Sequence, residues 1–316
     1  MKFKKILVVG IQKPQLDNFT WKSLSSLTNK IVLLSPDSRD IFKELKDSEA
    51  LLVYFNKADK EMIDGAPNLK YIGALATGVG KIDIKYASKK GVVVTNIPGY
   101  STESVAELVF GVLLENSREI SRAKTESKKG NRSELGFSAR EIKGKTFGVL
   151  GLGRIGARVA ELAQAFEANV IYWSKTRKKS YEKRGVKYSS MNDLLKKSDI
   201  ISIHFSLNDR TNNILNKSKV KQIKKGAIVI NTAPMELIDY EALKNRIKSG
   251  NITFIFDHTD LGDITEKRLK ELQRYKNCIT YPAIGYISQE ARVNKQKIFV
   301  DNIKSFLKGK PTNTVE

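Results

Sequence analysis

The chain has 316 residues, of which 41% are hydrophobic, and its formal net charge is +22 at pH 7. This length allows two domains that each bury an apolar core, and nothing in the sequence requires a repeat or a fibre. No apolar run approaches the roughly 18 residues that a membrane-spanning helix needs, so we expect no membrane partner.

The positive charge is spread along the chain. Lysines occur in nearly every amphipathic segment, which is typical of solvated helix faces. No basic stripe interleaved with aromatic residues is present, and no helix-turn-helix or zinc-knuckle spacing occurs, so we expect neither a nucleic-acid partner nor a metal site. The single cysteine, Cys278, excludes an internal disulfide and indicates a reducing, cytoplasmic location.

The first third of the chain carries short apolar runs that end in turn residues. The run at residues 6–10 follows a basic head, as in a signal peptide, but it is short and lacks a cleavage pattern, so a strand is predicted. Further strands are predicted at residues 31–35, 50–55, 71–77 and 92–96. Runs that are apolar on both faces are typical of parallel strands covered by helices.

A long helix is predicted to follow and to join two domains. Ser101 or Thr102 can cap it, and its apolar face consists of Val105, Leu108, Val109 and Val112. Residues 127–144 are the best candidate for an exposed loop. A second strand series is predicted at residues 147–151, 170–173, 199–205, 227–231, 252–257 and 278–284, which indicates a second α/β unit.

The tail after residue 287 is predicted to be helical. Its apolar side consists of Ile298, Phe299, Ile303 and Phe306. We expect this helix to pack on the first domain, so that the chain crosses between the domains twice.

A glycine-rich turn stands between the first strand of the second series and the next helix. It reads Gly151, Leu152, Gly153, Arg154, Ile155 and Gly156. Glycines at this spacing permit a tight turn, let the backbone approach a pyrophosphate and seat the helix against the strand. Because a strand precedes the turn and a helix and another strand follow it, the pattern predicts a dinucleotide-binding loop. A glycine-rich turn without a ligand is the alternative.

The end of the next strand indicates which dinucleotide is bound. NAD-selective proteins place an acidic residue there, on the ribose 2'-hydroxyl. This chain has no carboxylate at that point and reads Ser174, Lys175, Thr176, Arg177, Lys178 and Lys179. A 2'-phosphate would gain charge-assisted hydrogen bonds from Arg177 and Lys175, so we expect NADP in preference to NAD. A solvated basic loop is the alternative for Lys178 and Lys179.

The chain resembles the D-2-hydroxyacid dehydrogenase family, which includes glyoxylate/hydroxypyruvate reductases and phosphoglycerate dehydrogenases. The likeness spans nearly the whole length and rests on APNLKYIGALATGVGKIDI, GVVVTNIPGYSTESVAEL, GKTFGVLGLGRIG, SDIISIHFSLNDRTNNILN and GAIVINTAP. It implies an α/β fold with a Rossmann-type doubly wound parallel sheet at residues 98–287, which binds NAD(P); with the basic residues after the second strand, we expect NADP there. It also implies a smaller flavodoxin-like α/β substrate domain, split between residues 1–97 and 288–316, and a homodimer built around the cofactor domain.

The resemblance implies roles for individual residues. A small-molecule substrate would place its carboxylate on the backbone amides of Gly78, Val79 and Gly80. Lys81 follows these amides and is a candidate to supply positive charge, with a surface lysine as the alternative. On the cofactor side, Thr232 and Ala233 would border the nicotinamide and Asp257 would orient its carboxamide. Thr211 and the loop after His204 would lie beside the cofactor, and we interpret His204 as a cofactor-side or structural residue, with Ser206 replacing the usual proline.

The sequence departs from the family at the positions that do the chemistry. Pro234 stands where relatives carry the arginine that binds the substrate, and Ala283 stands where they carry the proton-donating histidine. The glutamate that supports the histidine has no clear counterpart, although Asp260 and Asp263 lie near its place. A positioned general acid contributes about 10² to 10⁴ in rate, so we expect the usual reduction of a 2-oxo acid to be lost.

Two hypotheses follow. In the first, the protein is an NADP-dependent oxidoreductase with relocated chemistry, which we favour because the residues expected around the nicotinamide are retained. His258 is then the first candidate for the proton donor, since histidine titrates near neutral pH, and Tyr286 and Tyr281 flank the vacated histidine position. A solvent-facing histidine and packing tyrosines are the alternatives. In the second hypothesis, the protein is a catalytically inactive NADP(H)-binding sensor or assembly partner.

Overall fold

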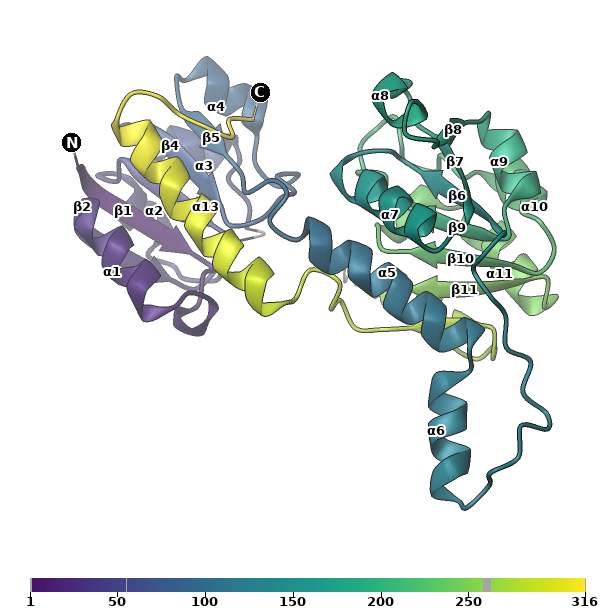
Figure 1. Ribbon diagram of the computed structural model, residues 1–316. Helices are drawn as coiled ribbons and strands as arrows, with labels where there is room; N and C mark the ends of the chain where they lie inside the picture. Colours follow the sequence, from purple (N-terminus) through teal and green to yellow (C-terminus); the bar gives the residue numbers. More distant parts are fainter. Residues whose placement is uncertain (1, 55, 258–262, 316) are drawn as a thin grey trace. The chain divides into compact units, whose positions relative to one another are not determined.

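The computed structural model describes residues 2–54, 56–257 and 263–315. The chain forms two compact units (Figure 1), of which the first comprises residues 1–100 and 288–316 and the second comprises residues 101–287. Among the described residues, no helix combines the length and the apolar composition that crossing a membrane requires.

The first unit contains a five-stranded parallel sheet with the strand order β2-β1-β3-β4-β5. Its strands are β1 (Phe3–Val9), β2 (Thr28–Leu34), β3 (Ala50–Val53), β4 (Tyr71–Ala74) and β5 (Val93–Thr95). Every residue of β3 and β4 is buried, as expected for central strands that are covered on both faces.

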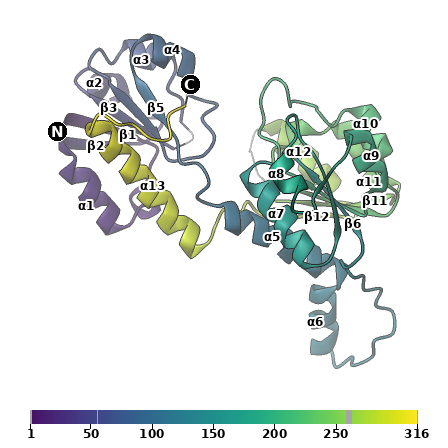
Figure 2. The same ribbon diagram turned by 45° about the horizontal axis from the view of Figure 1, so that its top comes forward.

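Helices cover both faces of this sheet. They are η1 (Lys13–Gln15), α1 (Asn18–Ser26), α2 (Ile41–Leu45), α3 (Lys60–Asp64), α4 (Ile84–Lys89) and α13 (Gln289–Leu307). Side chains of α1 and α13 pack on one face, and those of α2, α3 and α4 pack on the other. Figure 2 shows α13 running along its face of the sheet.

The predicted packing of the tail helix on the first unit is confirmed. Phe299 and Ile303 are fully buried against β1, β3 and β4, and Phe306 stacks on Phe3 with ring centroids 5.7 Å apart. The buried Asn302 side chain donates a hydrogen bond of 2.7 Å to the carbonyl oxygen of Asn96, next to β5. The C-terminal helix is therefore an integral layer of a unit whose sheet is formed by the first hundred residues.

The second unit contains a seven-stranded parallel sheet with the order β12-β11-β10-β9-β6-β7-β8. Its strands are β6 (Thr146–Leu150), β7 (Asn169–Trp173), β8 (Lys187–Tyr188), β9 (Ile200–Ile203), β10 (Ala227–Asn231), β11 (Ile252–Phe256) and β12 (Cys278–Thr280). Each predicted strand has a counterpart, although the last one is shorter than expected. The edge strand β8 was not predicted, because it has two residues and both are exposed.

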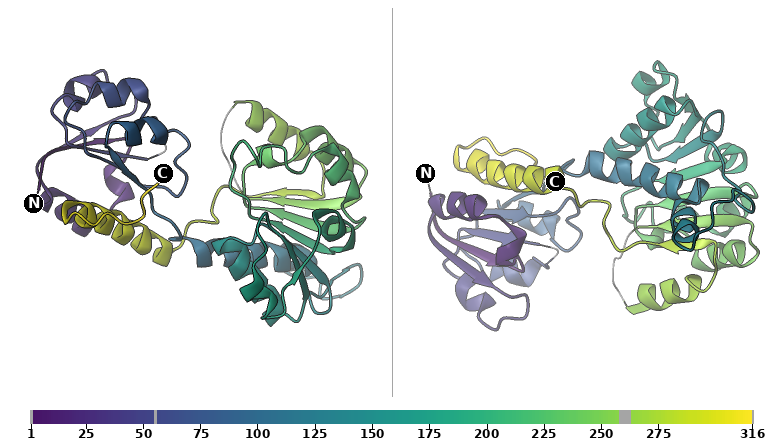
Figure 3. Two further views of the ribbon diagram at one scale, coloured as in Figure 1. Left: turned by 90° about the horizontal axis from the view of Figure 1, so that it is seen from above. Right: turned by 60° about the horizontal axis from the view of Figure 1, so that its bottom comes forward.

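The helices of this unit also form two layers (Figure 3). They are α5 (Thr102–Ser117), α6 (Ile120–Lys128), α7 (Arg154–Ala165), α8 (Lys179–Glu182), α9 (Met191–Lys197), α10 (Lys217–Gln222), η2 (Met235–Leu237), α11 (Tyr240–Lys248) and α12 (Asp263–Leu272). α5 and α7 cover one face, and α9, α10 and α11 cover the other. This is the doubly wound arrangement that the alternating pattern predicts.

Local signals explain where most helices begin. The N-cap side chain accepts a hydrogen bond from the first helical turn at Asp17, Asp59, Asp83, Ser190, Asn216, Asp239 and Ser288. Ser101 is the N-cap of α5, but its side chain makes no capping hydrogen bond. The predicted apolar face of α5 is confirmed, since Val105, Val109 and Val112 are buried and the half-buried Leu108 packs against the same cluster.

The segment after α5 extends away from the second sheet (Figure 1). α6 contributes no buried residue, and residues 129–144 are exposed or half-buried apart from Ile142. Ile120 is 50% exposed and Leu135 is 79% exposed, so this arm presents apolar side chains to its surroundings. The prediction of an exposed loop at residues 127–144 is confirmed for its larger part, while its first two residues belong to α6.

Candidate cofactor and substrate sites

The glycine turn has the backbone geometry that its spacing predicts. Gly151 follows β6 with a φ of 95°, and a Cβ there would lie 2.9 Å from the carbonyl oxygen of His204. A Cβ at Gly156 would lie 2.0 Å from the carbonyl oxygen of Gly151. No larger residue fits either position without moving its neighbours. Gly151 therefore sets the close approach of the turn to the end of β9, and Gly156 sets the close approach of α7 to the end of β6.

Gly153 differs from its two neighbours. Its φ is −82°, and a Cβ there would meet no atom within 4 Å. The backbone N–H groups of Arg154, Ile155 and Gly156 have no acceptor among the described residues, and no side chain caps α7. An open cradle with unpaired amides at the N-terminus of a 12-residue helix fits the pyrophosphate of a dinucleotide.

The end of β7 contains the predicted adenosine-side residues. The half-buried Ser174 donates its hydroxyl to the carbonyl oxygen of Thr176 at 2.7 Å, and Lys175 is exposed with no carboxylate within ion-pair distance among the described residues. Arg177 is already paired, because its guanidinium donates to both carboxylate oxygens of Glu182 at 3.1 and 2.5 Å. Lys175 is therefore an unpaired cation among the described residues, and a phosphate would have to share Arg177 with Glu182.

Glu182 organises this basic loop. Its carboxylate accepts hydrogen bonds from Arg177 and from the hydroxyl of Tyr172, and these bonds lower its pKa, so it is ionised at neutral pH. The Arg177 guanidinium also lies 4.7 Å from the centroid of the Tyr188 ring. The sequence analysis did not identify Glu182. Its place five residues after Arg177, at the end of a short helix, could have indicated an ion pair between the two.

His204 directly follows β9, at the carboxyl edge of the sheet. Its imidazole Nε2 lies 2.7 Å from the Ser202 hydroxyl, and its Nδ1 lies 3.5 Å from the Thr232 hydroxyl. Burial lowers the pKa of His204 to about 3, so the ring is neutral near pH 7. A neutral imidazole held between two hydroxyls agrees with the interpretation of His204 as a cofactor-side or structural residue.

The loops after β9 and β10 place the next predicted residues. The Thr211 hydroxyl donates to the carbonyl oxygen of Ser206 at 2.6 Å and accepts from the N–H of Asn208 at 2.9 Å, so it closes its own loop. Ala233 is buried, and its N–H donates to the side chain of the fully buried Asn231 at 3.1 Å. The Asn231 side chain thus fixes the backbone at Ala233, two residues after the end of β10.

Asp257 follows β11 and holds the loop that follows β12. Its carboxylate is 6% exposed and accepts the N–H groups of Ile284 and Gly285, each at 2.9 Å. A Cβ at Gly285 would lie 2.5 Å from a carboxylate oxygen of Asp257, so the loop needs glycine there. Asp257 was predicted to orient a nicotinamide carboxamide, and in this structure its carboxylate also fixes the loop that contains Ala283.

The candidate proton donors fall into three situations. The Tyr281 hydroxyl donates to Glu115 on α5 at 2.6 Å, and burial raises its pKa, so this tyrosine ties the loop to a helix. The half-buried Tyr286 has no hydrogen-bond partner for its hydroxyl among the described residues. His258 and Asp260 lie outside the described residues.

The predicted substrate amides lie in the first unit, in the turn after β4. The N–H groups of Gly78, Val79 and Gly80 have no acceptor among the described residues, and a Cβ at either glycine would meet no atom within 4 Å. Three consecutive unpaired amides are suited to a carboxylate. Lys81 is exposed, and its carbonyl oxygen accepts the N–H of Ala58 at 3.0 Å.

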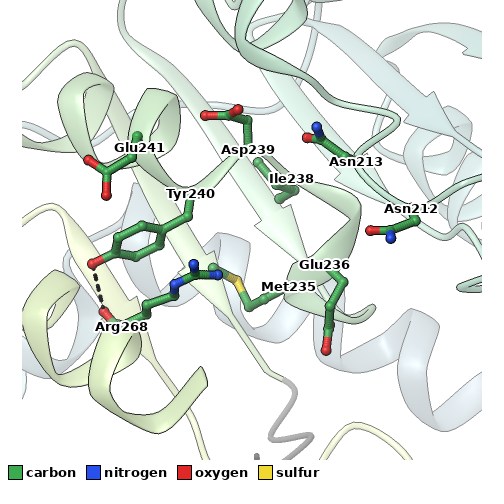
Figure 4. Close-up of a pocket in the computed structure, with 9 residues that line it drawn as sticks. All are labelled: Asn212, Asn213, Met235, Glu236, Ile238, Asp239, Tyr240, Glu241 and Arg268. Atoms are coloured by element: carbon green, nitrogen blue, oxygen red, sulfur yellow. Dashed lines mark hydrogen bonds between the residues drawn. The ribbon is translucent and has the colours of Figure 1, made fainter. Parts of the chain in front are cut away.

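A pocket of about 330 Å³ lies elsewhere in the second unit (Figure 4). Its lining residues come from the loop after β9, from η2 and α11, and from α12, where the Arg268 guanidinium lies 4.9 Å from the centroid of the Tyr240 ring. None of the predicted site residues lines it. Within the part of the chain that the structure describes, no group of three or more His, Cys, Asp or Glu side chains is arranged to hold a metal ion.

The doubly wound parallel sheet, its glycine turn and the unpaired amides of α7 define a dinucleotide-binding α/β protein. The family described as "D-isomer specific 2-hydroxyacid dehydrogenase, NAD binding domain" matches residues 110–285. The chain belongs to the D-isomer specific 2-hydroxyacid dehydrogenase family and is an oxidoreductase of that type with an NAD(P)-binding domain, which confirms the resemblance and the fold class inferred from the sequence.

Relatives cover most of the chain. A glyoxylate reductase of Thermococcus litoralis is 35% identical over 291 residues, which span 89% of this chain and 87% of the relative. A hydroxypyruvate reductase of Blautia hydrogenotrophica is 30% identical over 93% of this chain and 94% of its own length.

Solved structures show the same architecture. A D-lactate dehydrogenase of Aquifex aeolicus, complexed with NAD and lactic acid, has a TM-score of 0.86 at 29% identity and covers 96% of each chain. An acyclic imino acid reductase in complex with NADPH and D-Arg has a TM-score of 0.84 at 29% identity and covers 99% of this chain and 100% of that chain. Both forms of the nicotinamide cofactor therefore occur on this fold.

Proposed function

We propose that the protein is an NADP-dependent oxidoreductase that reduces a small anionic 2-oxo acid, or a related carbonyl or imine, without the arginine and histidine of its relatives. The observation that carries this proposal is the open cradle at Gly153, with unpaired amides at the N-terminus of α7. The bound cofactor would supply the hydride. The remaining requirements, which are binding, orientation and proton transfer, fall to side chains and amides of this chain.

The preference for NADP rests on the end of β7. No carboxylate stands at Ser174 to accept the two ribose hydroxyls, and Lys175 is an exposed cation without an acidic partner in the described part of the chain. Arg177 would contribute through the guanidinium nitrogen that Glu182 does not occupy. A 2'-phosphate therefore gains charge-assisted hydrogen bonds that an unphosphorylated ribose does not form.

The substrate class follows from the turn after β4. The amides of Gly78, Val79 and Gly80 present three donors in a row, which suits a carboxylate. The relatives named glyoxylate reductase and hydroxypyruvate reductase act on small acids of this kind. We therefore assign a two- or three-carbon 2-oxo acid, or its imine, as the substrate to test first.

Proton transfer has to use a residue other than Ala283. Tyr286 lies in the same loop, its hydroxyl has no partner among the described residues, and it stands directly after the Gly285 amide that Asp257 holds. Among the residues that the structure describes, we propose Tyr286 as the proton donor. His258, which lies outside them, is the alternative. A tyrosine is a weaker acid than histidine at neutral pH, so turnover slower than that of a relative with the usual histidine is expected.

The decisive experiment measures NADPH oxidation by absorbance against a panel of 2-oxo acids, aldehydes and imines. Turnover that Tyr286→Phe lowers by about 10² or more would support the tyrosine, whereas turnover lost in His258→Ala and kept in Tyr286→Phe would assign the histidine. The Tyr281→Phe variant serves for comparison, because its hydroxyl is donated to Glu115 and its loss should lower thermal stability more than turnover.

A second candidate function is an NADP(H)-binding sensor or assembly partner without catalysis. Pro234 and Ala283, at the positions where relatives are expected to carry the substrate-binding arginine and the proton-donating histidine, favour this non-catalytic function. NADPH binding by calorimetry, with no oxidation by any member of the panel, would establish this function and exclude the enzyme.

We further propose that the protein is a cytoplasmic homodimer. The arm formed by α6 and residues 129–144 exposes Ile120 and Leu135, and a second copy that covered it would bury these side chains. The sequence contains one cysteine, Cys278, which is buried, and a chain without a cysteine pair suits a reducing compartment. Light scattering should give twice the chain mass for the wild type, and Leu135→Asp should reduce it towards the monomer.

A further inference from the structure

One lysine of the first unit is placed unlike the many surface lysines. Lys295 is half-buried on α13, between the buried side chains of Ala291 and Phe299 in sequence. Its ammonium group lies 5.4 Å from the centroid of the Tyr54 ring. No carboxylate of the described residues lies within ion-pair distance of it, whereas Lys297 on the same helix pairs with Asp301 at 2.8 Å.

The surroundings of Lys295 lack negative charge. Burial lowers its pKa below the usual value, and the positive charge of Arg292 lowers it further. Arg292 and the neutral face of Tyr54 are the charged and titratable groups that face it within the described part of the unit. A half-buried ammonium without an acidic partner among the described residues can still accept a negative partner, so this position suits an anion that is not part of the protein.

Lys295 lies at the edge of the sheet that carries the substrate amides. Tyr54 directly follows β3, and Gly78 begins the unpaired amides a few residues after β4. β3 and β4 are adjacent parallel strands, with Val53 opposite Ala74, and the N–H of Leu75 donates to the carbonyl oxygen of Val53 at 2.8 Å. Because parallel strands end at one edge, the lysine and the three amides share the carboxyl edge of one unit.

We propose that Lys295 is a substrate-binding residue, which holds the carboxylate of the small acid together with the amides of Gly78, Val79 and Gly80. It supplies the positive charge that the family's arginine provides and that Pro234 removes. This inference rests on the proposed function and adds the residue that selects an anionic substrate. Lys81, the candidate from the sequence, has an exposed side chain and no aromatic ring beneath it.

Calorimetry with oxamate, an unreactive analogue of a small 2-oxo acid, tests the proposal on the 316-residue protein saturated with NADPH. Lys295→Met should weaken oxamate binding about ten- to hundredfold, since a hydrogen bond to a charged group is lost, and Lys295→Arg should retain most of it. The matched control is Lys297→Met, which removes an exposed lysine from the same helix and should leave oxamate affinity unchanged.

Two outcomes contradict the proposal: no oxamate binding by the wild type, or equal affinity in the wild type and Lys295→Met. The pH dependence of oxamate affinity gives a second test, which a purely structural role of Lys295 would not affect. Oxamate affinity of the wild type should fall with rising pH before an ordinary lysine titrates, and Lys295→Arg should remove that fall. Oxamate binding needs no turnover, so a protein that binds oxamate through Lys295 but oxidises no NADPH refutes the proposed enzyme and leaves this site standing.

Discussion

Two alanine substitutions in the glycine turn should affect different properties: Gly153→Ala should weaken NADPH binding, and Gly156→Ala should lower stability. In Gly153→Ala the added methyl points into open space, and alanine accepts the φ of −82°. The unfolded chain also loses entropy, so the free energy of unfolding should change by less than about 1 kcal/mol. If a pyrophosphate lies on this surface, the methyl displaces it from one or more amides, and each charge-assisted hydrogen bond is worth about 1.5 to 3 kcal/mol. NADPH affinity should then fall at least about tenfold.

In Gly156→Ala the methyl would lie 2.0 Å from the carbonyl oxygen of Gly151. Because that atom belongs to the backbone, α7 must move away from β6, and overpacking of this kind costs about 1 to 3 kcal/mol or more. The melting temperature should therefore fall by several degrees with or without cofactor, at about 2–4 °C per kcal/mol for a unit of this size.

Nucleotide binding and stability have to be measured separately to distinguish the two glycines. NADPH titration followed by nicotinamide fluorescence gives the affinity, and urea unfolding of the cofactor-free protein gives the stability. Wild-type NADPH affinity in Gly153→Ala would refute the assignment of this turn as the pyrophosphate site. Wild-type stability in Gly156→Ala would refute the packing argument.

Three further predictions concern the neighbouring elements. Lys175→Ala should weaken NADPH binding about tenfold while it leaves NADH affinity within about twofold, as measured by titration of each nucleotide; an equal loss of both would contradict the phosphate assignment. The pKa of His204 is about 3 in the folded protein, against about 6.5 in the unfolded chain. At pH 5 the unfolded chain is therefore protonated at His204 and the folded protein is not, which should lower the free energy of unfolding by about 2 kcal/mol relative to pH 7. Urea unfolding at both pH values should show this loss in the wild type and not in His204→Gln, and identical pH dependence would disprove it. Gly285→Ala should lower the free energy of unfolding by about 1 to 3 kcal/mol, because its Cβ would lie 2.5 Å from the Asp257 carboxylate. In a double-mutant cycle with Asp257→Asn, the two losses of stability should not add. Additive losses would show that the two residues do not act together.

The sequence by itself determined the layers of this protein and its glycine turn. Short runs that are apolar on both faces predicted buried parallel strands, because burial on both sides of a strand leaves its mark on consecutive residues. The turn was readable because Gly151 needs a positive φ and Gly156 a close backbone neighbour, and only glycine meets both demands. The strand β8 escaped because its two residues are exposed and carry no apolar pattern.

Only the tertiary structure decided which polar side chains are available for ligands. Arg177, which the sequence predicts to bind a 2'-phosphate, also pairs with Glu182, and Asp257, which is predicted to orient a carboxamide, also holds the amides of Ile284 and Gly285. Lys295 looked like one surface lysine among many until α13 brought it over Tyr54, a residue far away in the chain. Backbone conformation and strand burial are recorded locally in the chain, whereas the partner of a charged side chain depends on which distant segments the fold brings beside it.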